Sequence, residues 1–149
     1  VMSVYGPDSF KICRNYKVFP MIRLLYIDDN PDTCTIVAAF CERIGTFTVQ
    51  VLNSGESALE WLSSSTADVI VSDYDIPGGM NGMTLLRELH TRGNTTPFIL
   101  FTSKDSHELK EEAYRNGAFS VISKATPGKN PIHQLIRTIY WAASRISPE

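Results

Sequence analysis

Hydrophobic residues gather in five short runs along the chain. Most of these runs are continuously apolar, which is typical of strands buried on both faces of a parallel sheet. The predicted strands are Ile22–Ile27, Phe47–Leu52, Asp68–Ser72, Phe98–Thr102 and Phe119–Ile122. The first clean pattern starts at Met21, and Val1–Pro20 shows neither helical nor strand periodicity. We therefore expect a domain over residues 21–147, with residues 1–20 as an N-terminal extension or linker.

Between these runs, apolar residues recur every three or four positions and predict five helices. The helices are expected from Asn30, from Ser57, around Leu85–Leu89, over about Asp105–Asn116 and from Asn130. The sequence contains start and stop signals for the first helix. Asn30 is a good N-cap, Pro31 fits the first turn and Gly45 favours the end of the helix. Ser57 and Glu60 have the spacing of a capping box and predict the start of the second helix.

Five strand–helix units joined by right-handed crossovers form either an open doubly wound sheet or part of a barrel. Five strands are too few for a closed barrel. The sequence therefore predicts an α/β fold of the flavodoxin-like kind, a five-stranded parallel sheet in order 2-1-3-4-5 with helices on both faces. In such a sheet, ligands bind at the carboxyl ends of the strands, beside the point where the strand order reverses.

Composition narrows the class of protein further. The 149 residues are 43% hydrophobic and 20% charged, which suits one globular domain and excludes intrinsic disorder. The formal net charge of −2 argues against direct nucleic-acid binding. Every apolar run is far shorter than the ~20 residues that a membrane span requires, so membrane insertion is not expected. Cys34 and Cys41 are too far apart on the predicted helix to form a disulfide, and we expect a cytoplasmic protein.

Polar residues of reactive types stand at the predicted strand ends. They are Asp28, Asp29, Asp73, Thr102 and Lys124. Neighbouring strands lie about 4.8 Å apart, so the acids after the first and third strands should converge. Three clustered carboxylates repel one another unless a cation joins them. Oxygen ligands favour a hard divalent ion, Mg²⁺ or Mn²⁺.

This constellation resembles the receiver domain of two-component response regulators. The resemblance covers about residues 21–146 and is carried by Asp28-Asp29, the segment VIVSDYDIP that holds Asp73, FTS with Thr102, and ISK with Lys124. It implies that Asp73 is the phosphoacceptor.

The same resemblance implies the roles of the other site residues. Asp29, Asp73 and the backbone carbonyl of Asp75 would hold Mg²⁺, with Asp28 acting through water. Lys124 and Thr102 would contact the phosphoryl group. A sensor histidine kinase or phosphotransfer protein would donate that group, and the domain would catalyse only its own phosphorylation and dephosphorylation. The signal would leave through the fourth helix, fifth strand and fifth helix to a downstream protein or fused output domain, and a homodimer is also compatible.

The sequence departs from the family pattern at three places. Lys124 is followed by Ala125 where the family has proline, and we expect a trans bond because a cis bond without proline costs about 2.5–4 kcal/mol. Val121 stands where the family has a rotating aromatic side chain. The loop from Pro77 to Gly82 is one residue longer than usual and glycine-rich, which predicts a mobile loop.

Other interpretations stay open at this point. Taken singly, Asp28 or Asp29 is equally compatible with the cap of a helix. His90, His107 and His133 lack ligand spacing and receive no role. Asp73-Tyr74-Asp75 has the Asp-x-Asp spacing of haloacid-dehalogenase-like phosphatases, which turnover of a phosphomonoester would reveal. A flavodoxin-like FMN binder would absorb visible light. A receiver-like interaction module would act without phosphorylation.

Overall fold

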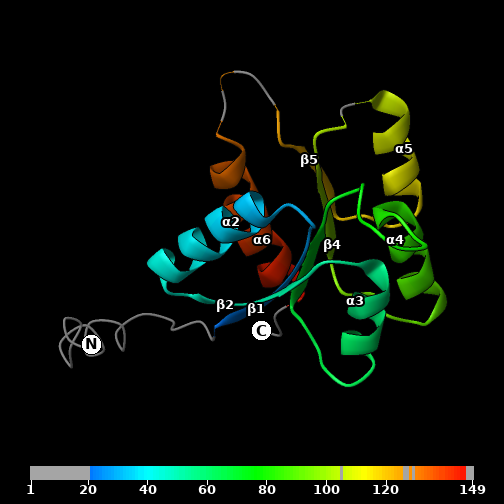
Figure 1. The fold of residues 1–149 in the computed structure, drawn as a ribbon, viewed down its shortest axis with the longest axis horizontal. Coiled ribbons are helices and arrows are strands. Elements are labelled where there is room, and N and C mark those ends of the chain that lie inside the picture. Colours follow the sequence, from blue (N-terminus) through cyan, green and yellow to red (C-terminus); the bar gives the residue numbers. More distant parts are fainter. Residues whose placement is uncertain (1–20, 105, 126–127, 129, 147–149) are drawn as a thin grey trace.

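The computed structural model describes residues 21–104, 106–125, 128 and 130–146 (Figure 1). Five parallel strands form one sheet in the order β2-β1-β3-β4-β5, which confirms the predicted topology. The strands are β1 (Ile22–Ile27), β2 (Phe47–Leu52), β3 (Val69–Ser72), β4 (Phe98–Thr102) and β5 (Ser120–Ser123). The predicted extension, residues 1–20, lies outside the described residues.

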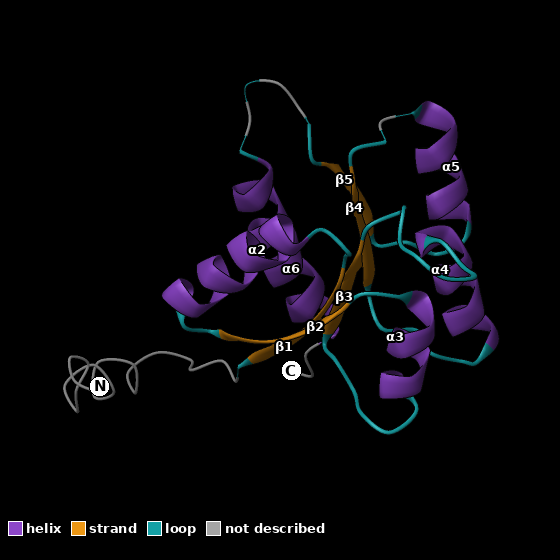
Figure 2. Cartoon of the chain, in the orientation of Figure 1, coloured by secondary structure: helices purple, strands orange, loops and turns teal. Residues whose placement is uncertain are grey.

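In the described residues, five helices cover the two faces of the sheet. They are α2 (Pro31–Ile44), α3 (Gly55–Leu62), α4 (Gly82–Thr91), α5 (His107–Arg115) and α6 (Pro131–Ile146). Figure 2 shows α2 and α6 on one face and α3, α4 and α5 on the other. In the described part of the chain, no helix combines the length and the apolarity needed to cross a membrane.

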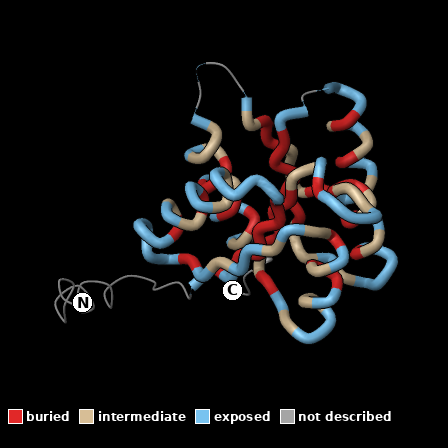
Figure 3. Tube along the Cα trace, viewed as in Figure 1, coloured by how far each residue is buried: buried red, intermediate tan, exposed pale blue. Residues whose placement is uncertain are grey.

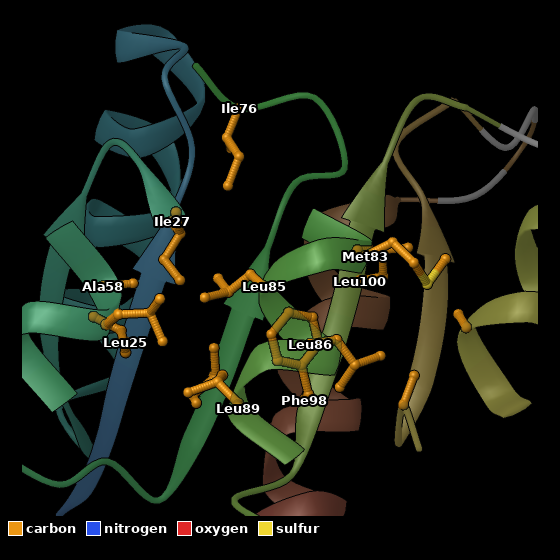
Figure 4. Close-up of a cluster of buried hydrophobic side chains, with 14 of the residues drawn as sticks. Leu25, Ile27, Ala58, Ile76, Met83, Leu85, Leu86, Leu89, Phe98 and Leu100 are labelled. Atoms are coloured by element: carbon orange, nitrogen blue, oxygen red, sulfur yellow. The ribbon is translucent and has the colours of Figure 1, made fainter. Parts of the chain in front are cut away.

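A hydrophobic core lies against each face of the sheet. Strands β3 and β4 are buried along their whole length, whereas the edge strand β2 is largely exposed (Figure 3). In the core beside α3 and α4, Leu85, Leu86 and Leu89 pack on Leu25 and Phe98 (Figure 4). The predicted burial on both faces is therefore right for β3 and β4, whereas β2 carries polar, exposed residues at Thr48 and Gln50.

Asparagine residues start three of the described helices, and at α4 the side chain of Asn81 accepts from the backbone N–H of Thr84. The side chain of Asn30 accepts hydrogen bonds from the backbone N–H groups of Asp32 and Thr33, as its N-cap position predicts. Asn130 does the same for Ile132 and His133 at the start of α6. These caps satisfy donors that have no partner within the helix.

Three predicted boundaries are wrong. Helix α3 begins at Gly55 because Ser54, in extended conformation, is its N-cap and accepts from the N–H of Ser57, so Ser57 lies in the first turn. Strand β3 begins after Asp68, whose side chain accepts from the backbone N–H of Arg23. Strand β5 is shifted by one residue and begins at Ser120.

Candidate functional site

The strand register brings two of the predicted acids together. Ile27 at the end of β1 is paired with Ser72 at the end of β3, and the N–H of Asp73 donates to the carbonyl of Ile27 at 2.9 Å. Asp28 and Asp73 therefore leave the sheet side by side. A carboxylate oxygen from each of Asp28, Asp29 and Asp73 lies within 4.8 Å of the others. This cluster stands at the point where the strand order reverses, as predicted.

Lys124 reaches into this acidic cluster from β5. Its Nζ lies 2.8 Å from Oδ2 of Asp28 and 3.1 Å from Oδ2 of Asp73. The ring of Phe101 lies beneath the ammonium group, with its centroid 5.4 Å from Nζ. Burial alone would lower the pKa of Lys124, but the hydrogen bond to Asp28 and the charges of Asp73 and Asp28 outweigh it and raise that pKa. Lys124 is thus a fixed positive charge between two carboxylates.

Asp28 is the most buried of the three acids, with only 1% of its surface exposed. Its Oδ1 accepts from the N–H of Asn30 at 3.0 Å, and its Oδ2 accepts from the hydroxyl of Tyr26 at 2.9 Å as well as from Lys124. Both carboxylate oxygens are therefore held by donors from the chain. The sequence interpretation missed Tyr26, although its place two residues before Asp28 puts both side chains on one face of the strand.

The thiol of Cys34 contacts the same region from the first turn of α2. Its Sγ donates to the backbone carbonyl of Asp28 at 3.4 Å. Burial, followed by the charge of Asp28, raises the pKa of Cys34. The neutral thiol is the form that this environment favours.

Thr102 is fully buried at the end of β4. Its hydroxyl oxygen accepts from the N–H of Lys104 at 3.1 Å, and its carbonyl accepts from the N–H of Lys124 at 2.9 Å. The four strand ends β1, β3, β4 and β5 thus deliver the five predicted side chains to one edge of the sheet.

Asp75 and Lys104 flank the cluster without forming an ion pair in the described structure. The ammonium of Lys104 instead lies 5.5 Å from the centroid of the Tyr74 ring. Asp75 is exposed, and its N–H makes a long contact of 3.4 Å with Oδ1 of Asp73.

The glycine-rich loop between β3 and α4 has defined contacts with α3. Gly78 has a left-handed φ of 98°, and the N–H of Gly79 donates to Oε2 of Glu56 at 2.8 Å. Met80 lies so close to Gly55 that a Cβ there would stand 2.5 Å from its Cγ. The predicted mobility of the loop stays a prediction, but these contacts determine where it lies.

The other two departures from the family pattern lie on or directly after β5. The described residues contain no cis peptide bond, so the Lys124–Ala125 bond is trans as expected. Val121 is half-buried, and its N–H donates at 3.2 Å to the hydroxyl of Tyr114 on α5. An aromatic side chain does contact this strand, therefore, but it comes from the helix.

The histidines lie apart from the acidic cluster and from one another. His107 pairs with Glu111 on α5, His133 packs edge-on against Phe40, and His90 lies against Gly117. Within the described residues, the potential metal-ligand cluster consists of aspartates alone.

Comparison with known proteins identifies the family. The model of the response regulator receiver domain matches residues 24–137, and the chain belongs to this family. The transcriptional regulatory protein ZraR of Escherichia coli is 30% identical over 103 residues, which are 69% of this chain and 23% of ZraR. The DNA-binding transcriptional regulator NtrC of Escherichia coli is 35% identical over 77 residues, which are 52% of this chain and 16% of NtrC.

Solved structures agree with this assignment. The receiver domain of the Francisella response regulator 1452 superposes with a TM-score of 0.76 at 26% identity, over 85% of this chain and 99% of that one. The receiver domain of a signal transduction histidine kinase from Syntrophus aciditrophicus gives 0.73 at 25% identity, over 86% and 94%. The chain is thus a response regulator receiver domain of two-component systems.

Proposed function

We propose that this receiver domain accepts a phosphoryl group on Asp73. The observation that carries the proposal is the position of the Lys124 ammonium, 3.1 Å from the Asp73 carboxylate in a cluster of three acids. An oxygen of Asp73 would attack phosphorus, and the bond from phosphorus to the donor would break. Lys124 would then offset the negative charge of the phosphoryl oxygens. Thr102 would donate its hydroxyl proton to one of those oxygens.

The donor set fits a hard divalent cation. Three carboxylates face one ammonium group, so the cluster carries an excess of negative charge, and all of its ligand atoms are oxygen. We assign Asp29, Asp73 and the backbone carbonyl of Asp75 as ligands of Mg²⁺ or Mn²⁺. Asp28 would act through water, because chain donors already engage both of its oxygens. When bound, the ion supplies positive charge beside the phosphoryl oxygens.

The decisive experiment measures intact mass after incubation with Mg²⁺ and acetyl phosphate. The wild-type domain should gain one phosphoryl group, and Asp73→Asn should gain none. Asp75→Asn is the matched control, because only its backbone carbonyl has a proposed role, and it should still be phosphorylated. Phosphorylation of Asp73→Asn at the wild-type rate would overturn the proposal.

The phosphoryl donor would be a histidine kinase or a phosphotransfer protein, and the encounter would take place in the cytoplasm. The signal would leave through α5, β5 and α6 to a downstream protein, a fused output domain or a second copy of the chain. Support comes from the matched regulators, whose names describe transcriptional control.

Helix α5 should transmit more of this signal than in relatives with an aromatic residue on the strand. Val121 is too small to act as a rotating switch, whereas Tyr114 of α5 is bonded to the backbone of β5. Phosphorylation should shift the NMR signals of Ser103–Asn116, because Thr102 precedes this segment and should move toward the phosphoryl group. Shifts confined to Asp28, Asp29 and Asp73 would contradict this route.

A phosphatase of the haloacid-dehalogenase type has less support. Its Asp-x-Asp pair would follow the first strand, whereas Asp73 and Asp75 follow β3. Sustained turnover of a phosphomonoester would favour that alternative over a single phosphorylation event.

A further inference from the structure

Tyr26 is a buried polar residue that the proposed phosphorylation chemistry does not yet use. It is 0% exposed and lies in the apolar core between the sheet and helices α2 and α6. Its hydroxyl donates to Oδ2 of Asp28 at 2.9 Å. A buried tyrosine hydroxyl needs a hydrogen-bond partner, and here a carboxylate of the site provides it. An ionised carboxylate can only accept, so the Tyr26 hydroxyl is the donor in this hydrogen bond.

The same carboxylate oxygen also holds Lys124. Oδ2 of Asp28 lies 2.9 Å from the Tyr26 hydroxyl and 2.8 Å from Nζ of Lys124, which in turn lies 3.1 Å from Oδ2 of Asp73. The Asp28 side chain has 0% of its surface exposed, so bulk solvent does not screen the contacts of this oxygen with Tyr26 and Lys124. The attraction that Asp28 exerts on Lys124 therefore depends on the second donor that shares the oxygen.

We propose that Tyr26 is a positioning residue. Its hydroxyl weakens the electrostatic attraction of Asp28 for Lys124, so that the ammonium stays between Asp28 and Asp73. A hydrogen bond to a carboxylate oxygen withdraws negative charge from it, and this effect is strong in a dry, low-dielectric environment. Without the hydroxyl, Asp28 would attract Lys124 more strongly and draw it away from Asp73. The inference rests on the proposed phosphorylation of Asp73, where Lys124 would have to meet the incoming phosphoryl group.

Replacement of Tyr26 by phenylalanine tests the hydroxyl while it keeps the ring. Tyr140→Phe is the matched control, because the Tyr140 hydroxyl contacts Thr46, which precedes β2 at the amino-terminal edge of the sheet. At saturating Mg²⁺, Tyr26→Phe should be phosphorylated by acetyl phosphate about three- to tenfold more slowly than the wild type. Tyr140→Phe should stay within about twofold of the wild-type rate.

A second readout needs no phosphodonor. The ¹⁵N-detected ammonium signal of Lys124 should shift in Tyr26→Phe and stay in place in Tyr140→Phe. An unchanged Lys124 signal together with an unchanged rate would overturn the inference. Because the signal is recorded without phosphorylation, its failure is distinct from a failure of the Asp73 assignment, which Asp73→Asn tests separately.

A purely structural role for Tyr26 predicts a different pattern. If the hydroxyl acts through Asp28, its removal should change the phosphorylation rate less than twofold in an Asp28→Asn background. The same loss in both backgrounds would contradict the proposal. If Tyr26→Phe does not fold, the NMR signal of the Tyr26 hydroxyl proton provides an alternative test in protein that retains Tyr26. Lys124→Ala should shift that proton signal, and an unmoved signal would exclude the shared oxygen.

Discussion

Gly82 leaves no room for a side chain beside Asp73. A Cβ at this position would stand 2.3 Å from the carbonyl oxygen of Asp73 and 3.1 Å from Cα of Tyr74. Because both atoms belong to the backbone, Gly82→Ala should lower the free energy of unfolding by about 1–3 kcal/mol and slow phosphorylation. Urea denaturation and the intact-mass assay measure the two effects. Gly93→Ala has open space for the methyl group but a left-handed φ of 81°, so it should lower the free energy of unfolding and leave phosphorylation unchanged. Equal phosphorylation rates in both variants would refute this role of Gly82.

The contact between Lys104 and Tyr74 bears on the lifetime of the phosphorylated state. Lys104 follows Thr102 by two residues and flanks the acidic cluster, where its ammonium lies against the Tyr74 ring and would shield a phosphoryl group on Asp73. Lys104→Ala and Tyr74→Leu should each speed dephosphorylation about two- to fivefold, the equivalent of one exposed cation–π contact.

Asp75→Ala is the control for that experiment, since the described structure has no ion pair between Asp75 and Lys104. Its decay rate should match the wild type, as followed by loss of the phosphoryl mass with time. Equal acceleration in Asp75→Ala would show that the Asp75 side chain also protects the phosphoryl group.

The loop between β3 and α4 depends on helix α3 for its position. Glu56 in the first turn of α3 accepts the N–H of Gly79. Glu56→Ala should speed amide exchange at Gly79 about two- to tenfold, because an exposed hydrogen bond contributes about 0.5–1.5 kcal/mol. Glu56→Gln keeps an acceptor oxygen and should restore most of the protection. Unchanged exchange in Glu56→Ala would show that the loop does not depend on this contact.

The beginning of strand β3 is joined to β1 by an acid–base contact that predicts a pH dependence. Asp68 accepts from the N–H of Arg23 at 2.8 Å and from its Nη2 at 3.0 Å. Burial acts to raise the pKa of Asp68, but these hydrogen bonds outweigh it and lower the pKa below its ordinary value of 3.8. The stabilisation is thus present above pH 3.8 and is lost as the pH falls through the lowered pKa.

Asp68→Asn should therefore lower the free energy of unfolding at pH 7 by about 1 kcal/mol. The difference from the wild type should shrink as the pH falls below 3.8. Urea denaturation across the acid range measures it, with Glu42→Gln on the exposed face of α2 as the control. A difference that stays constant down to pH 2 would contradict the assignment.

For the molecule as a whole, a bound metal ion should act as a stabilising ligand. Asp28, Asp29 and Asp73 belong to two strand ends that separate on unfolding, so a cation that joins them favours the folded state. Mg²⁺ at 100 times its dissociation constant should raise the free energy of unfolding by about 2.7 kcal/mol. Asp29→Asn should remove most of this increment, and Asp32→Asn, in the first turn of α2, should retain it. If Mg²⁺ raises the free energy of unfolding equally in both variants, the ion does not bind at Asp29.

Much of the architecture follows from local signals in the sequence. The inner strands are continuously apolar because both faces of the sheet are covered, and that pattern predicts β1, β3 and β4 to within one residue. Asn30 caps its helix through neighbours two and three residues away, so the start of α2 is readable from the chain. The start of α3 is not, because Ser54 and Ser57 offer two capping positions and only the extended backbone of Ser54 selects between them.

The candidate site also has features that the sequence predicts and features that only the folded structure determines. Strand ends of a parallel sheet share one edge, so Asp28, Asp73 and Lys124 are predictable as neighbours although 51 and 96 residues separate the lysine from the two acids. The sequence by itself determined the fold, the edge of the sheet that carries the site and the residue types that meet there. Only the tertiary structure decided which carboxylate oxygen of the site accepts a hydrogen bond from which donor. Strand alternation places Tyr26 on the same face as Asp28, but the bond from its hydroxyl to Oδ2 forms only in the folded protein. Lys104 on the Tyr74 ring and Glu56 at Gly79 depend on side-chain packing between elements, for which no local pattern in the chain exists.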